Sequence, residues 1–408
     1  MTSAPAVALL RRPETVRDRC QRFLRLAEED ALPHFMLRPE RLAGAAEYVT
    51  DTIRRNYPEL QIPYHSRWRH FAAGQVDRWS ALQQKLEGLG EGEMARRRID
   101  LCVVSVLLDA GAGPDWRFTE ADGMQLGRSE GLAVASLHGF AAGLFSSDPR
   151  DPLRVDAAAL SSMSVEALGA AFQVGPSNPL TGLDGRVVLM RNLGAALTAR
   201  PDIFGSDPAR PGRLLDHLDR QAASGGLPAA SILVAVLEGL APVWPSRITL
   251  EGQNLGDVWR HPLAAPEGPA EGLLPFHKLS QWLSYSLAEV LEEAGRPVLA
   301  VDALTGLAEY RNGGLFIDLG VLRLRDPALA TQPLAMDHHA IIEWRALTVA
   351  LLDQLAVLVR QDLGLDAMSL PLARVLEGGS WAAGRRIAHT LRPDGGPPLR
   401  LISDGTVF

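Results

Sequence analysis

Apolar residues recur at three- and four-residue spacing along most of the chain, which is the period of an amphipathic α-helix. Two N-terminal stretches, 13–32 and 39–58, show this spacing and open with proline and glutamate, residues typical of a first helical turn. The same spacing predicts helices over 165–172, 213–223 and 229–244. The sequence therefore predicts a mainly α protein with a helical core.

The segment 273–297 predicts a further helix that ends at Gly295. Leucine and valine residues form one face of this helix, while Lys278, Gln281 and Tyr285 lie close together on a second stripe. A helix N-terminus beside a lysine is a favourable place for phosphate. The alternative for this stripe is an ordinary solvated helix face.

The stretch 340–359 is apolar nearly all round, which predicts a buried helix. Glu343 and Arg345 lie inside it, and buried charges are costly unless they are paired or used. Two interpretations remain open: internal salt bridges to neighbouring helices, or two pocket residues that point into a cleft.

One small β-hairpin is predicted over 307–322, where the Asn-Gly-Gly run at 312–314 supplies turn residues between β-favouring ones. On such a hairpin Glu309 and Arg311 would share a face, with Asp318 on the opposing strand. This group could present two carboxylates to a substrate, or it could form a cross-strand ion pair.

Loops rich in proline, glycine, serine and aspartate separate the helices, and no internal repeat is visible. We expect one catalytic unit over residues 1–408, with a division into two helical lobes near 140–200 as the alternative. A chain of 408 residues with 47% apolar and 22% charged residues has an ordinary globular composition.

Composition excludes several classes of protein. The net charge of −7 disfavours a nucleic-acid partner. Two cysteines cannot build a disulfide framework, and no apolar run reaches the ~18 residues of a membrane span. We therefore expect a cytoplasmic protein without a membrane partner.

No cofactor or metal motif is present. A phosphate-binding Gly-rich fingerprint, a nucleophile elbow and a zinc-hydrolase helix are all missing. His338 and His339 would point about 100° apart on a helix and make a poor metal pair. The sequence thus predicts neither a cofactor nor a bound metal.

The stretch YHSRWRHF, residues 64–71, gathers cationic and imidazole groups in eight positions. A solvated loop, a nucleic-acid contact and one wall of an anion-binding pocket are the three interpretations. We favour the pocket wall, with Arg67 and Arg69 as the main contacts and His65 and His70 beside them.

Six stretches resemble the uracil-catabolism protein family of the fungal and bacterial URC pathway, long filed as a domain of unknown function. They are YHSRWRHF, FSSDPRDPLRVDA, PFHKLSQWLSYSL, LTGLAEYRNGGLFIDLGVL, EWRALTVALLD and the terminal SDGTVF. The resemblance covers nearly the whole chain. It implies a role in uracil breakdown through a ribosylated, ring-opened intermediate, ribosylurea, and implies other enzymes of that route as candidate partners.

A more remote resemblance is to the queuosine-salvage N-glycosylases, helical proteins related in shape to DNA glycosylases. Their runs are similar to YVTDTI, GQNLGDVW, KLSQWL and EWRALT in the same order. The positions that match are Asp51, Gln253, Asp257, Trp259, Lys278, Gln281, Glu343 and Arg345. The stretch PFHK departs from the pattern, because the salvage family has a carboxylate just before its Leu-Pro-Gln run. The resemblance implies a DNA-glycosylase-like helical core.

Together these resemblances imply hydrolysis of the N-ribosyl bond of a ribosylurea-type ribosyl or phosphoribosyl compound. Such a reaction requires carboxylates near an oxocarbenium-like centre. We expect Glu343, Asp318 and Glu309 as catalytic candidates. The expected substrate-binding residues are His65, Arg67, Arg69, His70, Asp257, Trp259, Lys278, Gln281, Arg311 and Arg345. The alternatives are an amidohydrolase of the same pathway and a non-catalytic protein that holds a pathway intermediate.

Overall fold

The computed structural model describes residues 5–109, 111–244, 247–265, 267–268 and 270–402. The terminal stretch SDGTVF, residues 403–408, is one of the six that carry the family resemblance and lies outside the described residues. Helices dominate, and the strands are two or three residues long and pair only in twos. The predicted mainly α fold with a small β component is confirmed.

The bounds of the elements are as follows. The α-helices are α1 (Pro5–Leu10), α2 (Pro13–Glu28), α3 (Leu42–Asn56), α4 (Arg67–Phe71), α5 (Arg78–Gln83), α6 (Glu91–Leu107), α7 (Arg128–Ala141), α8 (Ala157–Ser161), α9 (Val165–Ala171), α10 (Leu183–Ala199), α11 (Pro201–Phe204), α12 (Leu214–Gln221), α13 (Ala229–Leu240), α14 (Lys278–Glu293), α15 (Tyr310–Asp318), α16 (His339–Leu363), α17 (Leu372–Val375) and α18 (Trp381–Leu391). The strands are β1 (Phe35–Leu37), β2 (Arg117–Thr119), β3 (Gln125–Gly127), β4 (Leu227–Pro228), β5 (Thr249–Leu250), β6 (Gln253–Asn254), β7 (Val258–Arg260), β8 (Leu273–Pro275), β9 (Val298–Leu299), β10 (Leu322–Leu324), β11 (Leu334–Ala335) and β12 (Leu401–Ile402).

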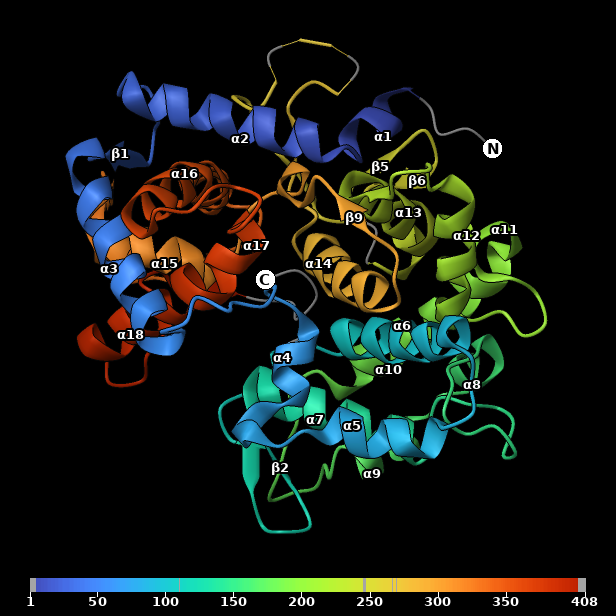
Figure 1. The fold of residues 1–408 in the computed structure, drawn as a ribbon. Coiled ribbons are helices and arrows are strands. Elements are labelled where there is room, and N and C mark those ends of the chain that lie inside the picture. The colour runs from blue at the N-terminus through green and yellow to red at the C-terminus, as the bar shows by residue number, and fades with distance from the viewer. Residues whose placement is uncertain (1–4, 110, 245–246, 266, 269, 403–408) are drawn as a thin grey trace.

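Helix α14 lies between two groups of helices (Figure 1). In one group α2 and α3 pack against the long helix α16, and α15 packs against α18. In the other group α6 packs against α7, and α10 packs against α8. Helix α14 packs on α6 and α13. Its first residue, Lys278, interacts with Glu309, which precedes α15, and with Asp109, which follows α6.

The predicted hairpin over 307–322 is wrong, because residues 310–318 form helix α15. The Asn-Gly-Gly run serves close packing instead of a turn. A Cβ on Gly313 would lie 2.7 Å from both Thr348 Oγ1 and Trp344 Nε1 of α16. The two glycines therefore let α15 approach its neighbours, and β pairing occurs elsewhere.

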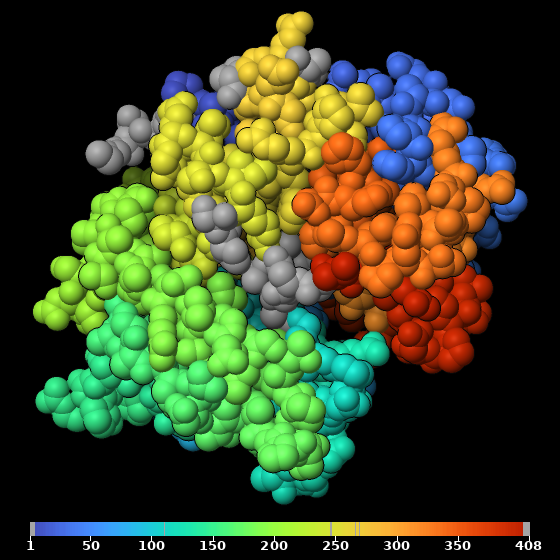
Figure 2. Space-filling model, turned by 180° about the vertical axis from the view of Figure 1, so that it is seen from behind, coloured from blue at the N-terminus to red at the C-terminus, as the bar shows by residue number. Residues whose placement is uncertain are grey.

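Two short β pairs help to position the site. Strand β1 pairs antiparallel with β10 and ties the N-terminal helices to the segment after α15. Strands β7 and β8 form an antiparallel pair that leads directly into α14. From behind, the yellow segment that contains these strands lies above the green helical region (Figure 2).

Helix α16 is buried along most of its length, as predicted, and Glu343 and Arg345 are 0% and 1% exposed. Among the described helices, none combines the length and apolar character needed to cross a bilayer. The division of the chain into lobes near 140–200 stays a prediction.

Candidate functional site

The start of helix α14 places Lys278. The preceding residue, His277, has a φ of 49°, in the left-handed region. The carboxylate of Asp257, just before β7, accepts the backbone N–H of Lys278 (Oδ2···N 3.0 Å). With its backbone held in this way, Lys278 places its ammonium near the carboxylates of Glu309 and Asp109, whose charges raise the pKa of the lysine against the effect of burial.

Asp257 and Arg345 form a bidentate ion pair. Both Nη···Oδ distances are 2.8 Å, and the two side chains are 8% and 1% exposed. Burial alone would raise the pKa of Asp257, but the guanidinium outweighs burial and lowers the pKa to about 2. Trp259 Nε1 also donates to Asp257 (2.6 Å). These three predicted substrate-binding residues thus satisfy one another inside the protein.

Glu309 is the N-cap of helix α15. Its Oε2 accepts the Arg311 N–H (2.7 Å) and its Oε1 accepts the Asn312 N–H (2.6 Å). The residue is 6% exposed. Burial raises the pKa of Glu309, although the two backbone N–H groups and the Lys278 ammonium act to lower it. Glu309 is therefore a buried carboxyl group whose protonated form is favoured more than usual.

Asp109 was not predicted, and it lies just beyond the end of α6. Its Oδ1 accepts from Arg67 Nη1 (2.8 Å) and from Ser129 Oγ (2.6 Å). Burial acts to raise the pKa of Asp109, but the Arg67 guanidinium, the Ser129 hydroxyl and Lys278 together hold the pKa below its usual value. Its Oδ2 makes no hydrogen bond with any described residue.

Asp109, Lys278 and Glu309 form what we call the carboxylate–lysine cluster. The pKa of Lys278 is lowered, with burial as the largest cause. The ammonium makes no hydrogen bond or ion pair with the part of the chain that the structure describes. The cluster therefore joins a carboxylate held ionised and a carboxyl group shifted toward protonation, with a lysine that acts on both.

The stretch 64–71 is extended up to its Ser66 N-cap and helical from Arg67 onward. Arg67 is 0% exposed and donates to Asp109 and to Ser105 Oγ (2.7 Å). Arg69 forms an ion pair with Glu289. Both guanidinium groups therefore bind side chains of the protein itself. These contacts give no direct support to the predicted wall of an anion-binding pocket.

A cavity of about 410 Å³, which we call the histidine cavity, has on its wall two histidines that interact with groups of the cluster or with their partners. Its volume is within the usual range of small-molecule sites, ~300–1,000 Å³. It is lined by His65, Arg69, His70, Ala73, Gly74, Gln125, Leu126, Gly127, Glu130, Glu377, Trp381 and Arg385. His65 is close enough to Glu309 to act on the pKa of that carboxyl group, and His70 contacts Arg67, the partner of Asp109.

The other predicted catalytic candidates lie apart from the carboxylate–lysine cluster. Asp318 ends helix α15 and forms a bidentate ion pair with Arg392 (Nη1···Oδ1 2.8 Å). Glu343 is buried and accepts the His34 backbone N–H (3.1 Å), with His261 Nε2 at 3.5 Å from its other oxygen. Each carboxylate therefore has partners of its own.

Two predicted binding residues have structural partners. Gln281 Nε2 donates to Thr305 Oγ1 (2.7 Å), and Gln281 Oε1 accepts the Thr305 N–H (3.1 Å). Arg311 Nη1 donates to the Gly395 carbonyl (2.6 Å). These bonds hold the loop before α15 and the segment near 395 in place around the cluster.

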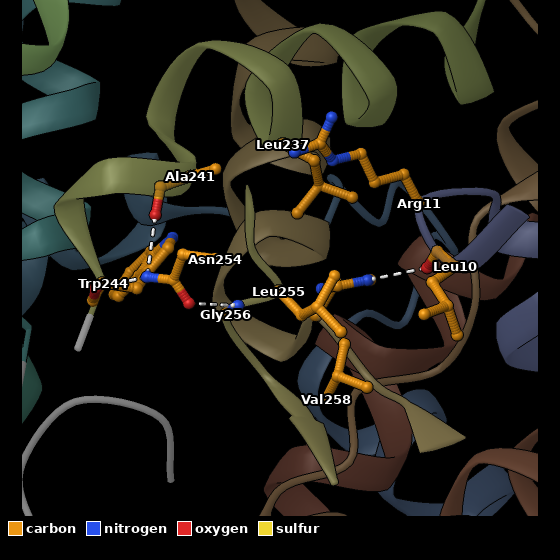
Figure 3. Close-up of a pocket in the computed structure, with 10 residues that line it drawn as sticks. Leu10, Arg11, Leu237, Ala241, Trp244, Asn254, Leu255, Gly256 and Val258 are labelled. Carbon is orange, nitrogen blue, oxygen red and sulfur yellow. Dashed lines mark hydrogen bonds between the residues drawn. The ribbon is translucent and has the colours of Figure 1, made fainter. Parts of the chain in front are cut away.

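A smaller void beside His277 has a volume of about 10 Å³. Figure 3 shows the aliphatic side chains of Leu237, Leu255 and Val258 around it, and Asn254 bonded to backbone groups at its edge. About one water molecule fills a space of this size. The histidine cavity is therefore the better place for a substrate.

Within the described ranges, no three His, Cys, Asp or Glu side chains are grouped as ligands of a metal ion. His65 and His70 line the histidine cavity, whereas His338 and His339 lie at the start of α16. These two pairs of histidines thus belong to separate places in the fold.

Comparison with known proteins identifies the family. Residues 9–408 match the model of a family described as protein of unknown function, DUF1688. The chain belongs to this family. The DUF1688 chain is 42% identical over 415 residues to Protein urg3 of Schizosaccharomyces pombe, with 100% of both chains covered. It is 40% identical over 408 residues to Uracil catabolism protein 4 of Lachancea kluyveri, with 92% of each covered.

These matches confirm the predicted resemblance to the uracil-catabolism family. The whole carboxylate–lysine cluster lies within the DUF1688 match, as does every described residue that lines the histidine cavity. The sequence signal for Asp109 was weak: a carboxylate that closes the run 101–108, which is apolar apart from Ser105.

Proposed function

We propose that this protein takes part in uracil catabolism and hydrolyses the N-ribosyl bond of a ribosylurea-type compound, with or without a 5′-phosphate. The name of one relative, Uracil catabolism protein 4, supports the metabolic context. The reaction itself is supported by the site, because the carboxylate–lysine cluster suits cleavage of a bond between a nitrogen and the anomeric carbon C1′.

The observation that carries the proposal is the grouping of Asp109 and Glu309, two largely buried carboxyl groups with different hydrogen-bond partners, around the side chain of Lys278. The directions of their pKa shifts agree with this reading. Glycoside hydrolysis passes through an oxocarbenium-like state and needs one ionised carboxylate and one protonated acid. The pKa of Asp109 is lowered, whereas burial raises the pKa of Glu309. Groups whose environments separate their pKa values in this way suit an acid and base assignment.

In the proposed reaction Asp109 Oδ2, which bonds to no described residue, stabilises positive charge at C1′. The C1′–N bond breaks, its electron pair stays on the urea nitrogen, and Glu309 supplies the proton that this nitrogen takes up. The oxygen of a water molecule forms the new bond to C1′, and its proton passes to a base. The ammonium of Lys278 orients an oxygen-rich ring or a phosphate group.

The direct test is to incubate the purified protein with ribosylurea and with its 5′-phosphate and to measure urea and the free sugar. We expect equal amounts of both products from at least one substrate. Asp109→Asn and Glu309→Gln should be inactive, whereas the control Asp318→Asn, at a carboxylate paired with Arg392, should keep its activity. Absence of turnover of both substrates by the wild-type protein would refute the proposal.

A second candidate function is hydrolysis of an amide bond in the same pathway. The observation that favours it is the contact between His65 Nδ1 and Glu377 Oε2 (2.8 Å), a pair suited to activating water. Product analysis separates the two candidates, because amide hydrolysis of ribosylurea releases ammonia instead of urea. Binding without any product would instead favour a protein that holds the intermediate.

A further inference from the structure

His65 and Glu377 form a buried pair at the edge of the histidine cavity. The His65 backbone N–H bonds to the Ala373 carbonyl (2.9 Å), and its Nδ1 lies 2.8 Å from Glu377 Oε2. Glu377 belongs to a π-helical turn, Leu376–Ser380, a feature frequent at functional sites. Because the carboxylate accepts, Nδ1 carries the ring proton. Nε2 is then left with a lone pair, and it has no hydrogen-bond partner among the described residues.

His70 has the opposite arrangement. Its Nδ1 lies 3.2 Å from Arg67 Nη1, and a guanidinium nitrogen can only donate. The Ser129 hydroxyl, 3.1 Å from the same Nδ1, directs its own proton to Asp109. Nδ1 of His70 therefore accepts, and its ring proton lies on Nε2. Burial and the Arg67 charge lower the pKa of His70 to about 3, so the ring is neutral at neutral pH.

Both rings belong to one wall of the cavity. The His65 and His70 centroids lie 5.9 Å and 6.3 Å from the Trp381 ring, and 6.3 Å and 5.6 Å from the Trp282 ring. Glu377 pairs with His65, and Glu309 also interacts with that ring. Arg67, Asp109 and Arg385 act on His70. The charged side chains of Arg69 and Glu130 line the same cavity. The two imidazoles thus offer different hydrogen-bonding groups to the same space.

We propose that His65 Nε2 is the base that takes a proton from the attacking water, and that His70 Nε2–H is a fixed donor to a substrate oxygen. This assignment rests on the proposed hydrolysis. The water oxygen forms the bond to C1′, and its proton moves to His65 Nε2. The C1′–N bond breaks with its electron pair on nitrogen, which takes a proton from Glu309. Glu377 is a positioning residue, because it fixes the tautomer and orientation of His65.

Nuclear magnetic resonance of the full chain with ¹⁵N-labelled histidine tests the tautomers without any need for activity. The expected spectrum at pH 7 has His65 protonated at Nδ1 and His70 protonated at Nε2, with each signal assigned by its loss in the His65→Gln or His70→Gln variant. The same tautomer at both positions, or a His70 that becomes protonated between pH 5 and 8, would overturn the proposal.

The same two variants give opposite results in the urea-release assay. A glutamine amide can replace the Nε2–H donor of His70, so His70→Gln should keep kcat within about tenfold, whereas His70→Ala should not. A glutamine at position 65 presents N–H groups where a lone pair is needed, or an oxygen too weakly basic to take a proton. His65→Gln should therefore lower kcat by about 100-fold or more.

Glu377→Gln tests the positioning role of Glu377. It also provides a second test of the proposal if the His65→Gln variant fails to fold. It should lower kcat and change the kcat/KM–pH profile, and Glu377→Asp should restore part of the loss. If the wild-type protein turns over the substrate and His65→Gln has the same kcat, the base assignment is refuted while the proposed function stands. Absence of turnover by the wild-type protein would refute the base assignment together with the proposed function, and the tautomers would still be decided by resonance.

Discussion

Replacing Asp257 by asparagine removes one charge from the most enclosed ion pair near the site. The carboxylate accepts both Nη groups of Arg345, the Trp259 indole N–H and the Lys278 backbone N–H. The amide keeps one acceptor and removes the carboxylate charge that faces the Arg345 guanidinium, which is 1% exposed. If this ion pair is structural, the variant should have a lower free energy of unfolding, while its KM for the substrate stays unchanged.

Two figures bound the loss of unfolding free energy in Asp257→Asn. Removing one partner of a buried ion pair costs about 3–5 kcal/mol. The pKa of Asp257 gives a second figure, since it falls from 3.8 to about 2 on folding. That shift corresponds to about 2 kcal/mol of stability, which is present above pH ~4 and is lost as the pH falls toward 2. We expect Asp257→Asn to cost about 2–5 kcal/mol at pH 7.

Urea unfolding followed by circular dichroism measures this cost. Asp219→Asn is the matched control, because Asp219 also forms a bidentate pair with an arginine, Arg296 (2.7 and 3.0 Å), but at the surface. Exposed pairs contribute about 0–1 kcal/mol. Equal losses in the two variants would refute the argument from burial. Unchanged stability with a raised KM in Asp257→Asn would restore the predicted substrate-binding role.

The remaining predictions concern the carboxylates and Lys278. Glu309→Gln should lower kcat by about 100-fold or more, at a cost of only about 1 kcal/mol in urea unfolding, because one of its two capping acceptors is lost. Lys278→Met should move both limbs of the kcat/KM–pH profile to higher pH, because the ammonium lowers the pKa of Asp109 and of Glu309; unmoved limbs would contradict the coupling. Glu343→Gln should keep kcat within about twofold, and a hundredfold loss would return Glu343 to the site.

Much of the helical architecture could be predicted because burial repeats with the helical period. The stretches that became α2, α3, α13, α14 and α16 show this period over many residues. The Asn-Gly-Gly run at 312–314 misled the prediction, since glycine permits both a tight turn and a close helix contact. Only the packing of Gly313 on Trp344 and Thr348 distinguishes the two uses.

The site was predictable only in part. Lys278 was singled out at the start of an expected helix, which is where the structure has it. Glu309 was singled out on an expected hairpin strand, whereas the structure makes it the N-cap of α15. Asp109 could not be singled out, since its proposed role depends on Arg67 and Lys278, which are 42 and 169 positions away along the chain. Buried arginines were expected to bind an anion, but the sequence does not show that Asp257 and Asp109 already neutralise Arg345 and Arg67.

The most direct test of the account is a crystal structure of the Glu309→Gln variant soaked with ribosylurea. We predict that the ribose binds between Lys278 and Asp109, with C1′ facing Asp109 Oδ2 and the urea nitrogen facing position 309. A ribose bound elsewhere, for example beside Glu343, would contradict it.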